Sequence, residues 1–319
     1  MNTDLLETQL VAYLGLREAL GFHMRAEKLL LSAFVAYVKA HEHTGPLRAQ
    51  MALEWACQAS TARGPSGAAR RLSMARGFLL YLQASAPETE VPAPGLLPSP
   101  QRPKPYLFTP TQITALFTAA QASRPRASLR PLTLSTLLGL LASTGLRVGE
   151  ALRLRGEHVH LALNPPQLHI RETKFHKSRI VPLHPSTAEH LQHYSVQRAR
   201  LHYDGLSDAF FVSERGQPVQ YGALQDWFAR LCQRVDIAPA AGGRKPCLMS
   251  FRHTFAVTRM QRWYQQGLDV QALLPHLSVY LGHVHPQESY WYLTAVPELL
   301  GAAAQRFQTY AMGGYGHGA

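Results

Sequence analysis

The sequence predicts a mainly α-helical protein with a small β-sheet (α+β), organised in two domains. Three observations lead to this fold class. Apolar residues recur every three or four positions over most of the chain, a single pair of short segments has strand-like composition, and a proline-rich stretch separates two helical regions. With 319 residues, the chain also exceeds the usual size of a single hydrophobic core. We therefore expect two domains with separate cores.

The first region, residues 5–83, has the apolar periodicity of amphipathic helices. Helix-breaking residues at Gly21, at Thr44–Pro46 and at Gly64–Gly67 divide it into about four helices. These form a small helical bundle in which residues 1–85 make the first domain. The periodic positions that predict its core are Leu10, Tyr13, Leu14, Leu20, Leu29, Leu30, Phe34, Tyr37, Leu72, Ala75, Leu79 and Leu82.

A connector follows between Ala86 and Pro105, where the sequence APETEVPAPGLLPSPQRPKP contains seven prolines and no helical or alternating pattern. Such a segment is semi-rigid and extended. We place the linker at residues 86–107 and the domain boundary within it.

The second domain begins with a helix at about Pro110, since Thr109 and Gln112 have the spacing of a capping box around a first-turn proline. Further helices are predicted at 132–143 and 148–152, and from about residue 186 to 307. Between them, 167–171 and 179–183 are strand candidates joined by a polar turn. The glycine-rich end of the chain, residues 312–319, is expected to be a disordered tail.

The chain is basic, with a formal net charge of +12 and a sequence pI near 9.9, which favours a polyanionic partner and makes nucleic acid the leading candidate. The three cysteines, Cys57, Cys232 and Cys247, lack the spacing of a zinc module or a disulfide framework. The N-terminus does not resemble a signal peptide and no apolar stretch is long enough for a membrane span, so we expect a cytoplasmic protein without a membrane partner.

Four motifs in the second domain contain groups suited to holding and attacking a phosphodiester. They are STGLRVGEALRL with Arg147, RETKFHKSRIVPLH with Lys174, SFRHTFA with Arg252, and LGHVHPQESYWYL with His283 and Tyr292. Two guanidinium groups can bind phosphate oxygens through parallel hydrogen bonds, while an ammonium or imidazole group can transfer protons and a phenol can act as nucleophile.

The order and spacing of these motifs resemble the catalytic domain of the tyrosine recombinases, the phage integrase family, over about residues 108–300. The helical first domain resembles, more weakly, that family's core-binding (SAM-like) domain. The wording YWYLTAVPELL also resembles recombinases of transposons and other mobile elements. The resemblance implies a DNA-binding domain at 1–85 and a catalytic domain at 108–311.

The resemblance also assigns roles to individual residues. Arg147 and Arg252 would bind the scissile phosphate, His283 would hydrogen-bond the phosphate or the nucleophile, and Tyr292, nine residues beyond His283, would be the nucleophile. Lys174 would be the general acid, with Lys177 and Arg179 as competitors for that role, and Tyr290 is the second candidate for the nucleophile.

One position departs from the family pattern. The family motif HxxR has a histidine three residues before its second arginine, and this chain has Met249 there. A thioether cannot accept the proton of a tyrosine as an imidazole does. His253, His176 or water are the candidates to replace the missing base. Glu150, which would repel a phosphate, is interpreted as a support that orients a neighbouring group.

The function predicted from these residues is site-specific DNA recombination, with strands cut and rejoined through a 3′-phosphotyrosyl intermediate. No metal and no cofactor is expected, because the phosphotyrosyl bond conserves the energy of the phosphodiester. The predicted partners are double-stranded DNA and further subunits on it, either copies of this chain or related recombinases. The candidate DNA contacts are Arg63, Arg70, Arg71, Arg76, Lys177 and Arg179.

Three alternatives remain open at this stage. A type IB topoisomerase uses similar chemistry without exchanging partners. A catalytically weak or inactive recombinase-like accessory protein would bind DNA without cutting it, and Met249 favours that interpretation. An unrelated basic DNA-binding regulator would leave the ordered motifs unexplained.

Overall fold

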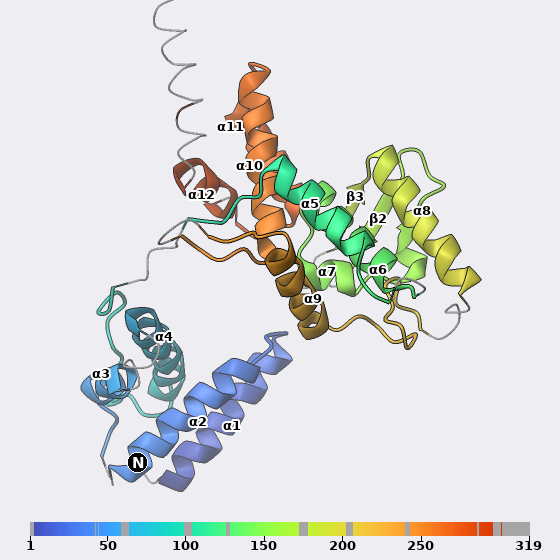
Figure 1. The fold of residues 1–319 in the computed structure, drawn as a ribbon. Helices are drawn as coiled ribbons and strands as arrows, with labels where there is room; N and C mark the ends of the chain where they lie inside the picture. The colour runs from blue at the N-terminus through green and yellow to red at the C-terminus, as the bar shows by residue number, and fades with distance from the viewer. Residues whose placement is uncertain are drawn as a thin grey trace, which may run out of the picture. The chain divides into compact units, whose positions relative to one another are not determined.

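The computed structural model describes residues 3–41, 43, 45–58, 64–98, 104–125, 128–171, 178–201, 207–239, 243–285, 287–295 and 301. The chain divides into two compact units, Met1–Arg102 and Pro103–Ala319 (Figure 1). The predicted tail at 312–319 and most of the predicted helix that follows Tyr292 lie outside the described residues.

In the described residues of the first unit there are four helices, α1 (Thr3–Ala19), α2 (Arg25–Ala40), α3 (Ala49–Gln58) and α4 (Gly64–Gln83). Helices α1 and α2 run side by side, and both pack against α4, as α3 also does (Figure 1). Their apolar faces meet in one core that includes Leu10, Phe34, Trp55 and Leu79. Burial of these faces, rather than intrinsic helix propensity, stabilises helices of this length.

Some details of the predicted first unit are wrong. Leu29 is 76% exposed and Leu20 is also exposed. The buried residues of α2 are Leu31, Phe34, Val35 and Val38, so its core face lies beside the one that we predicted, and Leu20 follows the last residue of α1. The break predicted at Gly64–Gly67 is also wrong, because α4 begins at Gly64. A proline at the second position of a helix is tolerated, since the amide it lacks would have no intrahelical partner there.

Part of the proline-rich segment packs onto the first unit. The Glu90 amide donates to the Leu47 carbonyl at 2.9 Å, and the Glu90 carboxylate accepts from the Ala49 amide at 3.1 Å. Thr89 is buried, and the Pro92 carbonyl accepts from Arg76 at 3.0 Å. These bonds satisfy main-chain groups outside regular secondary structure. Residues 89–92 are therefore part of the first unit's surface layer.

The second unit surrounds a buried helix. Thr109 caps α5 (Pro110–Gln121) in the predicted capping box with Gln112. The next helix, α6 (Arg130–Thr144), is buried along most of its length and contacts α5, α8 and α10. The other helices are α7 (Val148–Leu152), α8 (Pro185–Arg200), α9 (Tyr221–Arg234), α10 (Met249–Gln265), α11 (Val270–Leu281) and α12 (Gln287–Ala295).

A three-stranded antiparallel sheet lies between α7 and α8 in the sequence, with strands β1 (Val159–His160), β2 (Gln167–Ile170) and β3 (Arg179–Pro182) in that spatial order. Ile170 pairs with Arg179 at the end of the β2–β3 hairpin. The two predicted strands are confirmed. The two-residue strand β1 was not predicted, because two residues are too few to show an alternating pattern. The turn of the hairpin lies outside the described residues.

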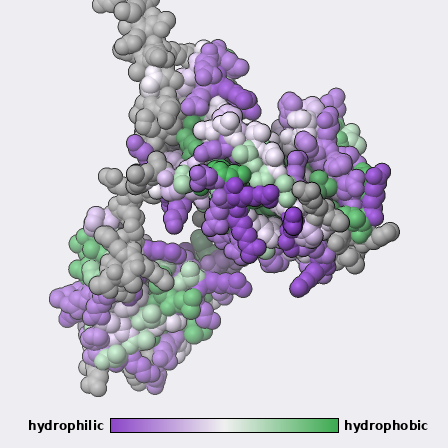
Figure 2. Space-filling view, viewed as in Figure 1, coloured by the Kyte–Doolittle hydropathy of each residue, from purple (hydrophilic) through white to green (hydrophobic). Residues whose placement is uncertain are grey.

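The predicted fold class, mainly α-helical with a small sheet, is confirmed. Figure 2 shows that the visible face of the second unit is largely hydrophilic, as expected when most of its apolar side chains enter the core. Within the described part of the chain, no helix is long and apolar enough to cross a membrane.

Candidate active site

The first arginine of the site stands where the chain passes from α6 to α7. Gly145 ends α6 with a φ of 63°, in the left-handed region, and its amide donates to the Leu141 carbonyl at 3.0 Å. Arg147 is the N-cap of α7, and its amide donates to Oε2 of Glu150 at 3.0 Å. The prediction that Glu150 orients a neighbouring group is confirmed.

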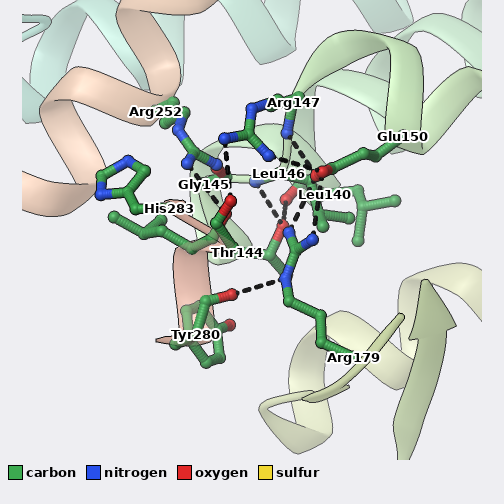
Figure 3. Close-up of polar contacts among 12 residues, drawn as sticks. Leu140, Thr144, Gly145, Leu146, Arg147, Glu150, Arg179, Arg252, Tyr280 and His283 are labelled. Atoms are coloured by element: carbon green, nitrogen blue, oxygen red, sulfur yellow. Dashed lines mark hydrogen bonds and ion pairs between the residues drawn. The ribbon is translucent and has the colours of Figure 1, made fainter. Parts of the chain in front are cut away.

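The guanidinium of Arg147 is held by two further bonds. Nη1 donates to Oε1 of Glu150 at 3.0 Å, and Nη2 donates to the Gly282 carbonyl at 2.9 Å (Figure 3). Its side chain is nevertheless partly exposed. A guanidinium has five N–H donors in a planar fork. Arg147 is therefore fixed in orientation and still reaches the surface, where it can meet an anion.

Arg252, on α10, is the second arginine and is only 3% exposed. Nη1 donates to the Gly145 carbonyl and Nη2 to the Leu281 carbonyl, both at 2.8 Å. Both acceptors lie at helix C-termini, where carbonyl groups lack intrahelical partners and cations are favoured. Arg252 thus joins the end of α6 to the end of α11.

The two guanidinium groups influence one another electrostatically. Burial, together with the nearby positive charge of Arg147, lowers the pKa of Arg252 to about 10. Arg252 therefore still carries its charge at neutral pH. Two like charges placed near each other in a partly buried position are well suited to an anionic ligand, which would relieve their repulsion. This is the electrostatic character expected of a phosphate site.

Tyr292 lies on α12 and is 2% exposed. Its Oη is 3.0 Å from Nδ1 of His253 on α10, and a charge on this phenol would favour the protonated form of Arg252. Tyr290, the second candidate for the nucleophile, is 44% exposed. Of the two tyrosines, Tyr292 is the one that the fold brings to the arginines. Trp291 packs against the apolar cluster that contains Tyr292.

His283 follows Gly282, the left-handed residue that ends α11. Its Nδ1 lies 2.6 Å from Oγ of the buried Ser289, which is one turn before Tyr292 on α12. Figure 3 shows the imidazole beside the guanidinium of Arg252. His283 therefore lies between the arginines and the helix that carries the tyrosine.

Arg179 is held by contacts within the protein. Its Nη1 and Nη2 donate to Glu150 at 3.1 and 2.8 Å, and its Nε donates to the Tyr280 carbonyl at 2.8 Å (Figure 3). Only 10% of its side chain is exposed. In this conformation all three of its nitrogens donate to the protein, and the DNA contact of Arg179 stays a prediction. Its pairing with Glu150 was not predicted, because the two residues are far apart in the sequence.

The charge of Glu150 should make the folded state sensitive to acid. Burial alone would raise the pKa of Glu150, but hydrogen bonds and charges from Arg179 and Arg147 outweigh burial and lower the pKa below 4.5. Ionised Glu150 therefore stabilises the folded state fully at pH values above the pKa that Glu150 has in the unfolded chain. This stabilisation is lost as the pH falls through the lower pKa that Glu150 has in the folded state. We expect Glu150→Gln to reduce the free energy of unfolding by about 3 kcal/mol at neutral pH, because two arginines lose their countercharge.

Urea unfolding of both proteins from pH 7 down to pH 3 measures this effect. The difference in free energy of unfolding between the wild type and Glu150→Gln should be constant down to about pH 5 and become smaller below that pH. A difference that stays the same across the whole range would contradict a charged Glu150 as its cause.

Gly282 should not tolerate a side chain. Its φ is 69°, and a Cβ atom would come within 2.6 Å of Nη1 of Arg179. Gly267 has a similar φ, 71°, but has nothing within 4 Å of that position, so Gly267→Ala is a matched control for backbone strain alone. We expect Gly267→Ala to cost about 1 kcal/mol and Gly282→Ala about 1–3 kcal/mol more. Denaturant unfolding measures both, and equal losses would show that contact with Arg179 is unimportant.

Met249 is the first residue of α10 and is 39% exposed. It stands four residues before His253, so the two side chains share one face of the helix. Lys174, Lys177 and His176 lie in the hairpin turn, outside the described residues. The general acid and its competitor therefore remain predictions.

The candidate DNA contacts of the first unit differ in their surroundings. Arg70 is exposed on α4. Arg71 instead donates to the Trp55 carbonyl at 2.9 Å and stacks on the Trp55 ring, and Arg76 donates to the Pro92 carbonyl. Arg71 and Arg76 thus have structural roles that helical position alone did not reveal. Arg63 lies outside the described residues.

The sequence motifs identified side chains but not their main-chain partners. The carbonyls of Gly145, Leu281 and Gly282 fix both arginines, and Ser289 contacts His283. Gly145 and Gly282 were a sequence signal for these carbonyl partners. A helix that ends in a left-handed residue exposes its last carbonyls, which can then accept hydrogen bonds. Among the described residues, no group of three or more His, Cys, Asp or Glu could hold a metal ion.

The fold is that of site-specific recombinases. The structure of XerH bound to palindromic difH aligns with a TM-score of 0.71 and 18% identity, covering 96% of this chain and 85% of XerH. The Tn1549 transposon integrase in complex with transposon right end DNA aligns with a TM-score of 0.62 and 15% identity, covering 93% of this chain and 98% of that one. At these identities the similarity concerns the fold alone.

Sequence similarity identifies the family. The model of the phage integrase family matches residues 107–298. A putative integrase/recombinase of Sinorhizobium fredii, y4rB, is 38% identical over 93% of this chain and 95% of its own length. Tyrosine recombinase XerD of Lacticaseibacillus casei is 28% identical over 73% of this chain and 76% of its own length. The chain therefore belongs to the phage integrase family of tyrosine recombinases, and the resemblance predicted from the motifs is confirmed.

Proposed function

We propose that this chain cuts and rejoins double-stranded DNA at specific sites through a covalent bond to Tyr292. The observation that carries the proposal is the convergence of Arg147, Arg252 and Tyr292, which come from three separate motifs. Arg147 and Arg252 donate to the adjacent carbonyls of Gly282 and Leu281. The hydroxyl of Tyr292 lies 3.0 Å from His253, the residue that follows Arg252. A phosphodiester bound by the two guanidinium groups would lie next to the phenol.

In the proposed reaction, Oη of Tyr292 forms a bond to phosphorus while the bond from phosphorus to the 5′ oxygen breaks. Arg147 and Arg252 donate to the nonbridging oxygens and stabilise the charge that develops on them. Lys174, or Lys177 if the turn has another register, gives a proton to the leaving 5′ oxygen. His283 donates to the phosphate from its position beside Arg252. A 5′ hydroxyl of the partner strand then reverses the step.

His253 is the proposed acceptor of the phenolic proton. Its Nδ1 lies 3.0 Å from Oη of Tyr292, which is hydrogen-bonding distance. Of the three replacements considered for the missing family histidine, His253 is the one that this contact supports. The substitution at Met249 would then leave the chain with a base supplied from the next turn of the same helix.

We expect His253→Phe to slow DNA cleavage by about 10²–10⁴-fold, since the ring remains but the proton acceptor is lost. Met249→His in the His253→Phe background should recover part of that rate, because residues 249 and 253 share a helix face. Single-turnover cleavage at saturating DNA measures both. If His253→Phe cleaves as fast as the wild type, His253 is not the base, and His176 or water takes its place.

The proposed function is tested by covalent trapping on a nicked suicide substrate, in which the released 5′ fragment diffuses away and prevents religation. A candidate element end supplies the DNA, and the adduct is mapped by peptide mass spectrometry. A DNA-linked peptide containing residues 287–295 is the expected result. DNA that carries paired sites distinguishes the two enzyme classes. A recombinase would form recombinant products from it, whereas a topoisomerase would only relax supercoiled DNA.

DNA binding and assembly belong to the same proposal. The XerH, Tn1549 integrase and lambda integrase structures are complexes with DNA, and those of lambda integrase include a dimer and a tetramer. We infer that residues 1–85 bind DNA as a core-binding domain, that residues 108–311 form the catalytic domain, and that several subunits assemble on the duplex. The net charge of +12 supports salt-sensitive binding, with Arg70 as an exposed candidate contact. Such a protein acts in the cytoplasm.

A second candidate function is that of an accessory protein that binds recombination sites without cutting them. Met249 favours it, because the family base is missing from that position. Tight binding without any adduct, in the wild type and in Met249→His alike, would support the accessory function.

A further inference from the structure

Glu150 is the acceptor that Arg147 and Arg179 share. Its Oε1 accepts from Nη1 of Arg147 at 3.0 Å and from Nη1 of Arg179 at 3.1 Å. Its Oε2 accepts from the amide of Arg147 at 3.0 Å and from Nη2 of Arg179 at 2.8 Å. An ionised carboxylate offers about four lone-pair positions to donors. The two arginines therefore fill the accepting capacity of Glu150, and Figure 3 shows the carboxylate between their guanidinium groups.

The three side chains differ in exposure. Arg147 is 26% exposed, whereas Arg179 is 10% and Glu150 only 2% exposed. Burial raises the pKa of Glu150, but hydrogen bonds and charges from Arg179 and Arg147 outweigh this effect, so the carboxylate is ionised at neutral pH. An ionised group that is buried to this degree is costly unless opposite charges compensate it. A buried negative charge is therefore in contact with the arginine that reaches the surface.

The charge of Glu150 works against phosphate binding by Arg147. A carboxylate in contact with a guanidinium orients it through hydrogen bonds, but it also cancels the positive charge that attracts an anion. Arg147 and Glu150 alone form a neutral pair. With Arg179 the group of three carries one positive charge at neutral pH, and Arg147 is the member of the group that is most exposed to a ligand.

Arg179 is held beside Glu150 by three hydrogen bonds. Its two terminal nitrogens form a bidentate pair with the carboxylate, and its Nε donates to the Tyr280 carbonyl at 2.8 Å. A bidentate pair fixes orientation as well as distance. A Cβ atom at Gly282 would lie 2.6 Å from Nη1 of Arg179, so the chain at the end of α11 also encloses this guanidinium. The positive charge of Arg179 is therefore kept next to Glu150.

We propose that Arg179 is a positioning residue that supplies the countercharge of Glu150, so that Glu150 orients Arg147 without neutralising it toward a bound phosphate. The proposal rests on the function proposed above, in which Arg147 binds the scissile phosphate. Arg179 then acts on the phosphate through Glu150 and Arg147, and its effect on the rate of cleavage depends on the charge of Glu150.

The test is a double-mutant cycle in the full-length protein, measured as single-turnover cleavage at saturating nicked DNA. We expect Arg179→Gln to slow cleavage by about 10²-fold, because a charge within about 4–6 Å shifts the ionisation equilibrium of a neighbouring group about 10–10³-fold. The double variant, Arg179→Gln with Glu150→Gln, regains one positive charge in the group. It should recover to within about tenfold of the wild-type rate, the remaining loss being that of a weaker hydrogen bond to Arg147. A purely geometric role predicts instead that the double variant is as slow as Arg179→Gln, or slower.

Two further variants distinguish charge from shape. Arg179→Lys keeps a positive charge beside Glu150 but lacks the planar fork, so it should cleave faster than Arg179→Gln. Arg200→Gln removes one positive charge from the exposed end of α8 and should cleave at the wild-type rate. Thermal unfolding identifies any variant that does not fold. If Arg179→Gln is one of them, the double variant still tests the proposal against the wild type, because it replaces a buried ion pair by two neutral groups.

Binding of inorganic phosphate makes the same comparison without cleavage. Phosphate stabilises a folded protein that binds it, and the part of this stabilisation that Arg147→Gln removes is assigned to the site. Arg179→Gln should lose that part as well, and the double variant should regain it. A protein that shows this pattern but forms no adduct would contradict the proposed function and support the countercharge of Arg179.

The proposal is overturned by a folded double variant that stays as slow as Arg179→Gln, or by site-specific phosphate stabilisation that Arg179→Gln leaves unchanged. Either result would indicate that Arg179 acts on cleavage in another way, through the Tyr280 carbonyl or through a direct contact with DNA.

Discussion

Tyr292→Phe should abolish covalent attachment to DNA while leaving the protein folded and able to bind DNA. Tyrosine and phenylalanine differ only in the hydroxyl group. Its partner, the imidazole of His253 on α10, stays in place. Because the aromatic ring stays in the apolar cluster of α10, α11 and α12, the packing is preserved. The expected result is a complete loss of the adduct, since a covalent intermediate cannot form without its nucleophile.

Tyr290→Phe is the matched control, two residues earlier on the same helix and exposed to solvent. It should form the adduct at the wild-type rate on the nicked substrate. An adduct that persists in Tyr292→Phe but disappears in Tyr290→Phe would reverse the assignment. Gel-shift titration of all three proteins verifies that DNA binding is unchanged.

Arg252→Lys should reduce the rate of cleavage by about 10²–10³-fold, the effect of removing one donor from a transition-state site. It should also lower the free energy of unfolding by about 1–3 kcal/mol, because a buried carbonyl of Gly145 or Leu281 loses its hydrogen-bond donor. Lysine keeps the charge but cannot reach both carbonyls and the phosphate together. The two losses have separate causes, so they should be separable by experiment.

Single-turnover cleavage at saturating DNA, well below the melting temperature, measures the first loss, and denaturant unfolding measures the second. Arg259→Lys, an exposed position on the same helix, controls for the substitution itself and should change neither quantity. A normal cleavage rate in folded Arg252→Lys would show that the second arginine contributes charge alone.

Features with a local signal could be predicted from the sequence. The capping box at Thr109 and the strands that flank the hairpin turn each depend on residues a few positions apart, and each is observed. Leu29 was misplaced because periodicity finds an apolar face only to within about one residue when neighbouring leucines compete. The break predicted before α4 was misplaced because glycine and proline are compatible with a first helical turn.

The site could be predicted only in part, for a related reason. Motifs name side chains with special chemistry, so Arg147, Arg252 and Tyr292 were identified together. They carry no information on which main-chain carbonyls those side chains will meet, because these come from helix ends brought together by the fold. The pairing of Arg179 with Glu150 was missed in the same way, because the two residues are far apart in the sequence and meet only in the folded structure.

The bonds from Arg252 to the ends of α6 and α11 mean that selection for a folded chain would retain this arginine even if cleavage were lost. The same holds for Arg147, which is tied to Glu150 and Gly282. The two arginines are therefore poor markers for separating active members of the family from derivatives that only bind DNA. The tyrosine hydroxyl is the better marker, because a phenylalanine ring would fill the same place in the apolar cluster without it.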